Sequence, residues 1–164
     1  MDRLTNEIVG LLPRLRRLGR VLTRDVTDAD DLVQMTVERA LRHRGQWRPG
    51  TRLDSWMFRI MKNAWIDESR VRSRRAAVMS PEALGEHVGD DGAAGLDARL
   101  EARALEAAVA RLPEDQRLAV ALVLVEGLSY KEAAEVLGVP QGTLTSRLGR
   151  GRAVLIAELQ EQAQ

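Results

Sequence analysis

The chain is predicted to be all-α, with two small helical domains. Apolar residues recur at spacings of three and four over several separate stretches, which is typical of amphipathic helices. Residues that start and stop helices flank these stretches. A segment rich in Gly, Ala, Pro, Ser and acids, residues 76–98, lacks this periodicity and separates an N-terminal part, 1–75, from a C-terminal part, 99–164. We interpret the segment as a flexible linker between two domains.

Composition excludes several classes of function. The chain has no cysteine, which rules out disulfides, thiolate chemistry and cysteine-bound zinc. His43 and His87 are isolated, so no metal site is expected. There is no nucleophile-and-base arrangement and no phosphate-binding Gly loop, so we expect neither catalysis nor a cofactor. No run of 18 apolar residues occurs, and the N-terminus is charged; we therefore expect a cytoplasmic protein that does not insert into a membrane.

Charge is distributed unevenly although the net charge is only +1. Residues 39–75 contain 11 basic and 3 acidic side chains, a net charge of +8. Residues 76–116 contain 3 basic and 9 acidic side chains, a net charge of −6. A strongly basic block indicates a polyanion-binding site, and the acidic block beside it fits a linker or a decoy.

The N-terminal part begins with two amphipathic helices. The first covers residues 6–24 and is expected to be interrupted or bent at Pro13. Thr27 is predicted to cap the second, with acids in its first turn. The apolar side of this second helix consists of Ala29, Leu32, Val33, Thr36, Val37, Ala40 and Leu41. Its opposite face carries Asp31, Gln34, Met35, Glu38 and Arg42, and is either simply solvated or a protein-docking patch.

Aromatic and basic residues are interleaved in the basic block. Four of the five aromatic residues fall within residues 47–65, beside several arginines and one lysine. Trp47 and Arg48 precede a Pro49-Gly50 turn and therefore lie on a loop. Asp54 or Ser55 is expected to cap the following helix, with Trp56, Ile60, Ala64 and Val71 on one side. Such a block suits unstacked bases, with rings stacking and charges tracking phosphates. Alternatively Trp56, Phe58 and Trp65 are core residues, a reading we favour for those three but not for Trp47.

The C-terminal part contains the clearest motif, two short helices joined by a fixed turn. A helix is expected over 99–112, followed by a buried helix over Leu118–Val125 that Gly127 ends. Ser129 and Glu132 form a capping box that starts the first helix of the motif. Gly138 ends that helix, and Pro140 forces a new one. This is the pattern of a helix-turn-helix.

The outer side of the second helix of the motif favours DNA binding. It carries an amide, hydroxyls and arginines, which suit a major groove, and no acid occurs between Glu135 and Glu158. The side chains concerned are Gln141, Thr143, Thr145, Ser146, Arg147, Arg150 and Arg152. A polar outer face of an ordinary helical hairpin is the alternative. Gly149 and Gly151 each cost a helix roughly 0.8–1 kcal/mol relative to Ala, so its C-terminal half is expected to fray until DNA holds it.

Three blocks in order resemble the extracytoplasmic-function sigma factors of bacterial RNA polymerase over nearly the whole chain. The first block is Asp28 to Gln34 with Val37 to Leu41. The second is Leu53 to Ile60, continuing through Asn63 and Asp67 to Arg75. The third comprises Leu112 to Arg117, Val125 to Ser129 and Gly138 to Leu148.

The resemblance implies a promoter-specificity subunit without catalytic activity of its own. Asp31, Gln34 and Glu38 would dock on the polymerase clamp coiled coil, and the C-terminal domain on the flap. Trp47 and Arg48 would capture a flipped base of the −10 element, which Asn63, Asp67 and Arg70 would help to read. Gln141, Thr143, Thr145, Ser146, Arg147 and Arg150 would read the −35 element. An anti-sigma factor is the expected regulator, and the free protein is expected to be a monomer.

Two residues depart from the family pattern. Met35 stands where many relatives have an acid, which affects the expected clamp contact, and Thr145 stands where many have a basic residue, which affects base preference. Two other functions were weighed. A dimeric helix-turn-helix repressor or activator would leave the Trp47 to Arg75 block without a role. A sigma mimic would sequester a regulator without touching DNA.

Overall fold

The computed structural model describes residues 2–76 and 95–163, and these are almost entirely helical. The chain folds as two compact units, Met1–His87 and Val88–Gln164. The described residues contain no strand, in agreement with the all-α fold expected from periodicity. Part of the expected linker, residues 77–94, lies outside the described ranges, and so does His87.

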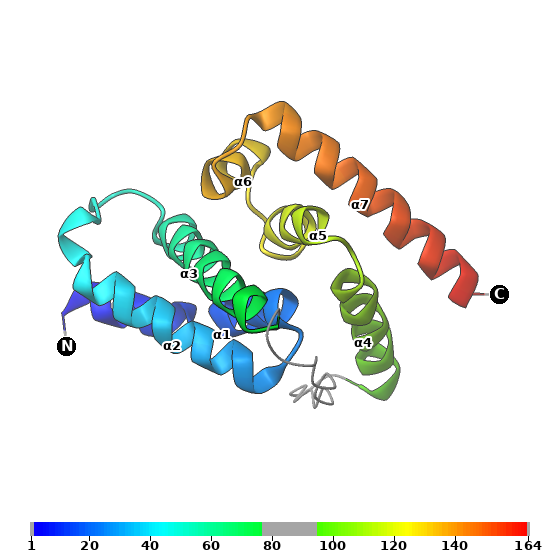
Figure 1. The fold of residues 1–164 in the computed structure, drawn as a ribbon, viewed down its shortest axis with the longest axis horizontal. Helices are drawn as coiled ribbons and strands as arrows, with labels where there is room; N and C mark the ends of the chain where they lie inside the picture. The colour runs from blue at the N-terminus through cyan, green and yellow to red at the C-terminus, as the bar shows by residue number, and fades with distance from the viewer. Residues whose placement is uncertain (1, 77–94, 164) are drawn as a thin grey trace. The chain divides into compact units, whose positions relative to one another are not determined.

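Three α-helices make up the described part of the N-terminal unit. They are α1 (Arg3–Thr23), α2 (Val26–Arg42) and α3 (Leu53–Ala76), with a short 3-10 turn, η1 (Arg44–Gln46), after α2. Each of the three helices packs against the other two (Figure 1). Large apolar side chains from all three helices fill the space between them: Leu15, Leu18, Leu22, Leu32, Met57, Phe58 and Met61 are buried. Phe58 and Trp65 are therefore core residues, as favoured from the sequence.

Two capping predictions in this unit were wrong, and of the two alternatives expected at Pro13, interruption or bending of the helix, the interruption does not occur. The cap of α2 is Asp25, whose carboxylate accepts a hydrogen bond from the Asp28 amide, and not Thr27. Helix α1 continues through Pro13 without interruption. Pro13 lies on the exposed side of α1, so water can satisfy the carbonyl that loses its helical donor. Asp54 lies inside the first turn of α3 and neither it nor Ser55 caps the helix.

Two apolar assignments in this unit also differ from the prediction. Leu41 of α2 is 37% exposed, and Val71 of α3 is 39% exposed. Both lie toward the C-terminal ends of their helices. The apolar spacing continues there, but within the described part of the chain no neighbouring helix covers these two side chains. Trp56 is only half-buried, because it faces the loop that carries Trp47.

Four α-helices make up the described part of the C-terminal unit: α4 (Leu96–Ala110), α5 (Glu114–Val120), α6 (Tyr130–Leu137) and α7 (Gln141–Gln162). A π-helical turn, η2 (Ala121–Val125), extends α5. Helix α7 packs against α4, α5 and α6. The buried guanidinium of Arg117 donates to the carbonyls of Ala110 and Leu112 and so fixes the corner between α4 and α5.

The start of α4 departs from the sequence prediction. The helix begins at Leu96, so residues 96–98, expected in the linker, are helical. Its apolar side is only partly buried: Ala108 and Val109 are covered, whereas Leu100 is 55% exposed and Leu105 42% exposed. Periodicity located the helix, but the length of its buried contact depends on where the partner helices end.

Candidate nucleic-acid interfaces and docking surface

The helix-turn-helix has the geometry that the sequence predicted. The Ser129 hydroxyl accepts from the Glu132 amide at 3.1 Å, and the Glu132 carboxylate accepts from the Ser129 amide at 3.0 Å, which completes the capping box. Gly138 is left-handed, with φ 68° and ψ 35°, a conformation that favours glycine. Pro140 then precedes α7. The turn thus fixes the direction of α7 relative to α6.

The outer side of α7 is polar and accessible. Leu144 and Leu148 are buried and anchor the helix, while the predicted reading side chains Gln141, Thr145, Ser146 and Arg150 are exposed, and Thr143 and Arg147 are half-buried. One turn of an α-helix is 3.6 residues, so Ser146 and Arg150 lie roughly opposite the buried leucines. The structure therefore brings all six predicted side chains onto one helix, with Ser146 and Arg150 the most outward of them.

Two of these side chains have intramolecular partners. The Thr145 hydroxyl donates to the Gln141 carbonyl at 2.9 Å, which turns it toward its own helix. The Arg147 Nε lies 3.7 Å from Asp115 Oδ2, in the first turn of α5. Arg147 thus lies on the flank of α7 that faces α5, and DNA contact would compete with Asp115 for it. No sequence pattern indicates this pairing, because the two residues are far apart in the chain.

Helix α7 is continuous through both of its central glycines. Gly151 is buried, and a Cβ built on it would lie 2.8 Å from Val120 Cγ2 of α5. Gly149 is exposed, and a Cβ there would meet no atom within 4 Å. The two glycines, equivalent in sequence, therefore differ: one allows α7 to approach α5 closely, and the other has no packing role. The helix is held by this contact, and the described structure shows no break at its centre.

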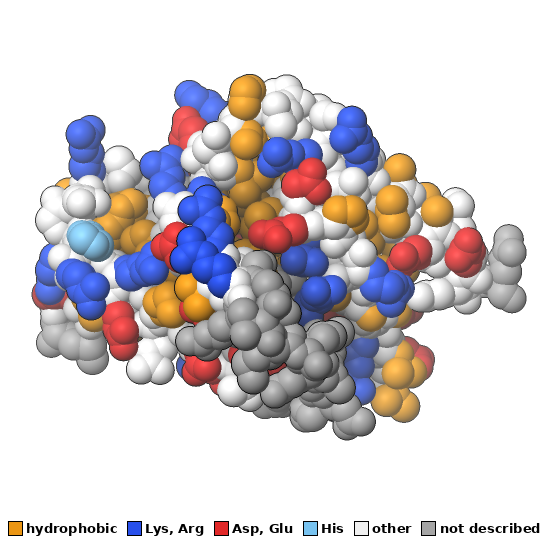
Figure 2. Space-filling model, in the orientation of Figure 1, with side chains coloured by type: hydrophobic (Ala, Val, Ile, Leu, Met, Phe, Trp, Pro, Cys, Tyr) orange, Lys and Arg blue, Asp and Glu red, His pale blue; other side chains and the backbone are white. Residues whose placement is uncertain are grey.

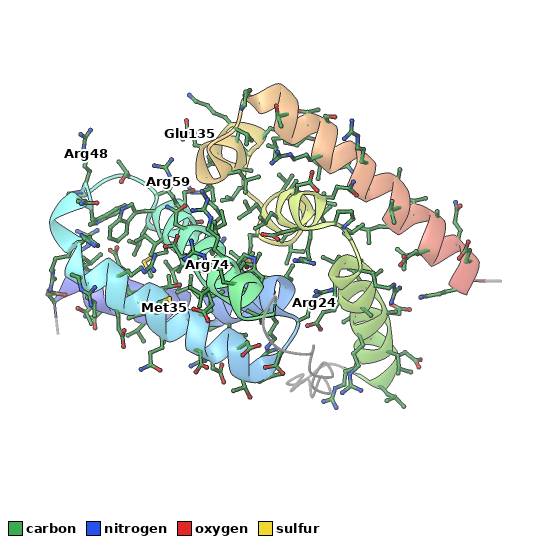
Figure 3. All side chains as sticks on the ribbon, in the orientation of Figure 1. Arg24, Met35, Arg48, Arg59, Arg74 and Glu135 are labelled. Atoms are coloured by element: carbon green, nitrogen blue, oxygen red, sulfur yellow. The ribbon has the colours of Figure 1, made fainter. Side chains whose placement is uncertain are left out.

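Trp47 lies on a loop in the N-terminal unit, as predicted, but it is half-buried. Its amide donates to the Arg44 carbonyl at 3.1 Å, which places it directly after η1. Its ring centroid lies 5.7 Å from that of Trp56, with the planes inclined at 41°. The loop closes because the Thr51 amide and hydroxyl both donate to the Arg48 carbonyl, at 3.2 and 2.7 Å. Arg48 projects outward from this loop (Figure 3).

Helix α3 continues the basic surface from the loop. Asn63, Asp67 and Arg70 are all exposed and, at spacings of four and three, lie on one side of the helix. The Asp67 carboxylate accepts from Arg39 of α2 at 3.1 Å, so it is tied to the neighbouring helix. Burial, together with the nearby Arg59 charge, lowers the pKa of Lys62. Basic side chains gather over α3 and the loop in Figure 2.

A small hollow lies next to Trp47. It has a volume of about 180 Å³ and is bounded by α2, η1 and α3 through Arg39, His43, Gln46, Trp56, Ile60 and Asn63. Of the predicted −10 residues, Asn63 lines it directly, and Trp47 makes a tilted ring contact with Trp56, which forms one of its walls. The structure therefore brings Trp47 and Asn63 to one place, whereas Arg70 lies two turns further along α3.

The predicted docking residues Asp31, Gln34 and Glu38 are all exposed on α2. Gln34 donates to Glu38 at 3.4 Å, and both line a groove of about 550 Å³ between α1 and α2. Arginines 16 and 20 of α1 line the same groove. Asp31 instead lines a separate hollow of about 180 Å³ toward α3, together with Met35. The patch predicted as one surface thus borders two depressions.

The sequence pattern assigned Asp54 only to a possible helix cap and did not predict that its carboxylate is a buried polar centre. It is buried and accepts hydrogen bonds from Arg52 and Arg14. The available signal in the sequence was a carboxyl two residues after Arg52, which ends a loop. The other partner, Arg14 on α1, is 40 residues away in the chain, so local spacing does not indicate it.

No cluster of three or more ligating side chains that could hold a metal ion occurs among residues 2–76 and 95–163. Over the same ranges, none of the helices combines the length and the apolar character needed to cross a bilayer.

Comparisons with known proteins match both halves of the chain. Residues 102–155 match the family described as sigma-70, region 4, and residues 8–62 match the sigma2 domain of PhyR. The ECF RNA polymerase sigma factor EcfG of Rhodopseudomonas palustris is 36% identical over 159 residues, which is 96% of this chain and 86% of that protein. SigM of Mycobacterium tuberculosis, also an ECF RNA polymerase sigma factor, is 40% identical over 143 residues, or 87% of this chain and 69% of that protein.

Solved structures show the same likeness. The sigma factor RpoE of Bartonella quintana, in complex with the anti-sigma factor NepR, superposes with a TM-score of 0.82 at 29% identity, covering 98% of each chain. CnrH, in complex with the cytosolic domain of CnrY, gives a TM-score of 0.66 at 27% identity, covering 96% of this chain and 90% of that one.

Proposed function

Because the chain belongs to the ECF RNA polymerase sigma factors, we propose that it binds core RNA polymerase, directs it to −10 and −35 promoter elements, and helps to melt the DNA. It acts in the cytoplasm as a specificity subunit and contributes no catalytic step of its own. The observation that carries this proposal is that the two candidate nucleic-acid surfaces lie on separate units, one in the segment that matches sigma-70 region 4 and the other in the segment that matches the sigma2 domain of PhyR.

The N-terminal unit takes the −10 element in this proposal. Trp47 is half-exposed beside the hollow that Asn63 lines, so a base leaving the duplex has both a ring to stack on and an amide within the same region. Arg48 and Arg70 supply charge for the phosphates, and Asp67, held by Arg39, presents a carboxylate from α3. Base extrusion costs a few kcal/mol, so core polymerase assists the melting.

The C-terminal unit takes the −35 element. The outward side chains of α7 enter the major groove, with Ser146 and Arg150 central and Gln141, Thr143, Thr145 and Arg147 at the flanks. The Thr145 hydroxyl is bonded to its own helix, so it contributes less to base reading than an arginine or a lysine would at this position. The segment between the end of α3 at Ala76 and the start of α4 at Leu96 connects the two units.

Asp31, Gln34 and Glu38 form the surface for the polymerase clamp coiled coil, and the C-terminal unit docks on the flap. The rims of the α1–α2 groove carry two arginines on one side and, on the other, the acids Asp30 and Glu38 with Gln34 beside them, which supports docking of a charged protein helix. Met35, between Asp31 and Glu38, adds an apolar contact where many relatives carry an acid. The free protein is a monomer, and an anti-sigma factor regulates it by covering these surfaces. Two of the structures that the chain resembles were solved with such partners, which supports this.

Run-off transcription tests the proposed function. The purified full chain is added to core polymerase and a library of genomic promoter fragments from the same organism. Transcripts that depend on the chain, with core polymerase recovered in a pull-down, are the expected result. A footprint on free DNA with two symmetric half-sites would indicate the dimeric repressor or activator instead. Polymerase capture without any transcript would indicate the sigma mimic. The matches over both halves of the chain do not favour either alternative.

A further inference from the structure

Asp54 is a buried carboxylate placed directly after the loop of residues 47–52. The residue is 8% exposed. Its Oδ1 accepts from Arg52 Nε at 3.1 Å and from the Ser55 amide at 2.8 Å. Its Oδ2 accepts from Arg52 Nη2 at 2.6 Å and from Arg14 Nη1 at 3.1 Å. Both oxygens are therefore hydrogen-bonded, as a buried charge requires.

Arg14 connects this carboxylate to another helix. It lies on α1, and its guanidinium carbon is 5.2 Å from the centroid of the Phe58 ring, within cation–π range. Phe58 is fully buried at the centre of the N-terminal unit. Asp54 is thus fixed by both α1 and the core, so that it forms a rigid point at the start of α3.

Arg52 connects Asp54 to the loop. It is the last residue of the loop, and two of its nitrogens donate hydrogen bonds to the Asp54 carboxylate. This bidentate contact fixes both the orientation of the guanidinium and its distance from Asp54. The loop is only six residues long, and its interior is closed by the hydrogen bonds from Thr51 to the Arg48 carbonyl. At the other end Trp47 rests on Trp56 of α3. Displacement of Arg52 would therefore move the whole loop.

We infer that Asp54 is a positioning residue for base capture: through Arg52 it holds loop 47–52, and with it Trp47 and Arg48, in the conformation that receives an unstacked base. This inference rests on the proposed role of the loop at the −10 element. A loop already in its binding conformation pays less ordering entropy when the base arrives. Asp54 itself is buried and does not touch DNA.

The first experiment uses the free full chain and does not depend on the proposed function. The protein is labelled with 5-fluorotryptophan, and its three fluorine resonances are assigned with single Trp→Phe variants. In Asp54→Asn we expect the Trp47 resonance to shift and narrow as the loop loosens, whereas the Trp65 resonance stays in place because Trp65 is buried away from the loop. An unchanged Trp47 resonance would overturn the inference.

A second variant covers the case in which Asp54→Asn unfolds the N-terminal unit. Arg52→Lys keeps the charge and the Arg14–Asp54 bond, but a lysine cannot form the two-pronged contact. We expect the same displacement of Trp47 with helical circular dichroism unchanged. If the Trp47 resonance is unchanged in this variant, Asp54 does not position the loop and serves only to join α1 to α3.

The third experiment measures promoter opening by the reconstituted holoenzyme. Removing a charged hydrogen bond of this kind should lower the rate of opening of a duplex promoter about tenfold in Asp54→Asn and Arg52→Lys. Initiation from a template with a pre-opened −10 region should fall much less, and binding to core polymerase should not change. Glu7→Gln breaks the exposed Arg3–Glu7 pair on α1 and serves as the matched control, with opening unaffected.

The outcomes separate the two levels of the proposal. A wild-type chain that supports no transcription would reject the proposed function, while the fluorine resonances would still report whether Asp54 holds the loop. Trp47 displaced in the free variants but normal opening in the holoenzyme would reject the positioning role. Equal losses on duplex and pre-opened templates would assign Asp54 to folding alone.

Discussion

Loop 47–52 in the N-terminal unit and helix α7 in the C-terminal unit carry the two proposed DNA contacts, but different forces position them. The loop is held by the charged hydrogen bonds of Asp54 and by one aromatic pair. Helix α7 is held by close packing, with the backbone at Gly151 against Val120 and with buried leucines along its inner side. A loop has no internal hydrogen-bond ladder and needs polar tethers, whereas a helix is rigid by itself and needs only a surface to lie on.

This difference predicts different sensitivities. The conformation of the loop should be sensitive to changes of charge and pH. The packing of α7 should be sensitive to changes of side-chain volume. The following variants test that separation, in decreasing order of expected effect.

Trp47→Ala should cause the largest functional loss. Stacking on an aromatic side chain contributes about 1–3 kcal/mol per base, so promoter opening should fall roughly tenfold or more. Binding to core polymerase should be unchanged, because Trp47 lies away from Asp31, Gln34 and Glu38 in the sequence and on a different element. Opening is followed by the fluorescence of a 2-aminopurine placed in the −10 element. Equal losses of opening and polymerase binding would mean that Trp47 is structural.

Gly151→Ala should destabilise the C-terminal unit by about 1–3 kcal/mol, because the added methyl meets Val120 Cγ2 and overpacks a buried contact. Urea unfolding of the full chain, followed by circular dichroism, measures this. A compensating Val120→Ala in the same chain should recover part of the loss. A Gly151→Ala protein as stable as the wild type would show that packing does not hold α7 in place.

Arg147→Ala should weaken binding of the holoenzyme to promoters that contain the upstream element by about 1–3 kcal/mol. Promoters in which that element is scrambled should bind the variant and the wild type alike. Asp115→Asn is the informative partner variant, since it releases Arg147 from its neighbour on α5 and should not reduce affinity. Affinity that Arg147→Ala leaves unchanged would remove this residue from the reading surface.

Gly149→Ala should stabilise the protein by about 0.5–1 kcal/mol, the opposite sign to the change at Gly151. The position is exposed, the added methyl meets no atom, and alanine has the higher helix propensity. The same urea experiment detects it as a higher midpoint with an unchanged slope. Destabilisation would indicate that space alone does not distinguish the two glycines.

Acid should loosen the N-terminal unit through Asp54. Burial by itself would raise the pKa of Asp54, but the hydrogen bonds from Arg52, the Ser55 amide and Arg14 outweigh burial and lower the pKa below its ordinary value of 3.8. A lowered pKa in the folded state gives stability that is present above pH 3.8 and is lost as the pH falls through the folded pKa. Because Arg52 is half-exposed and solvent screens the pair, the effect should be a few tenths to about 1 kcal/mol.

Acid unfolding of the wild type and of Asp54→Asn checks whether Asp54 stabilises the fold above its folded-state pKa. The two stability curves should differ at neutral pH and converge as the pH falls below 3.8. Asp2 also has a lowered pKa, from hydrogen bonds with Thr5 and then Arg44, and contributes in the same direction in both proteins. Curves that stay parallel to the lowest pH would exclude Asp54 as the group responsible.

The sequence by itself determined the all-α fold, the position of most helices and the second helix of the helix-turn-helix. These features are local, because each depends on only a few neighbouring residues and can be recognised in the sequence. They are the capping box of Ser129 and Glu132, the left-handed Gly138 and the apolar spacing of α7. The same holds for Trp47, which the Pro49-Gly50 turn places on a loop. The three blocks that resemble sigma factors are likewise visible in the order of the residues along the chain.

Only the tertiary structure decided how these elements are held and which side chains meet. Arg14 and Asp54 are 40 residues apart, Arg147 pairs with Asp115 across two helices, and Gly151 matters only because Val120 lies against it. Spacing in the sequence does not encode these distances, because they depend on how helices cross after the apolar faces are buried. The two glycines of α7 look alike in the chain, and packing alone gives them different roles.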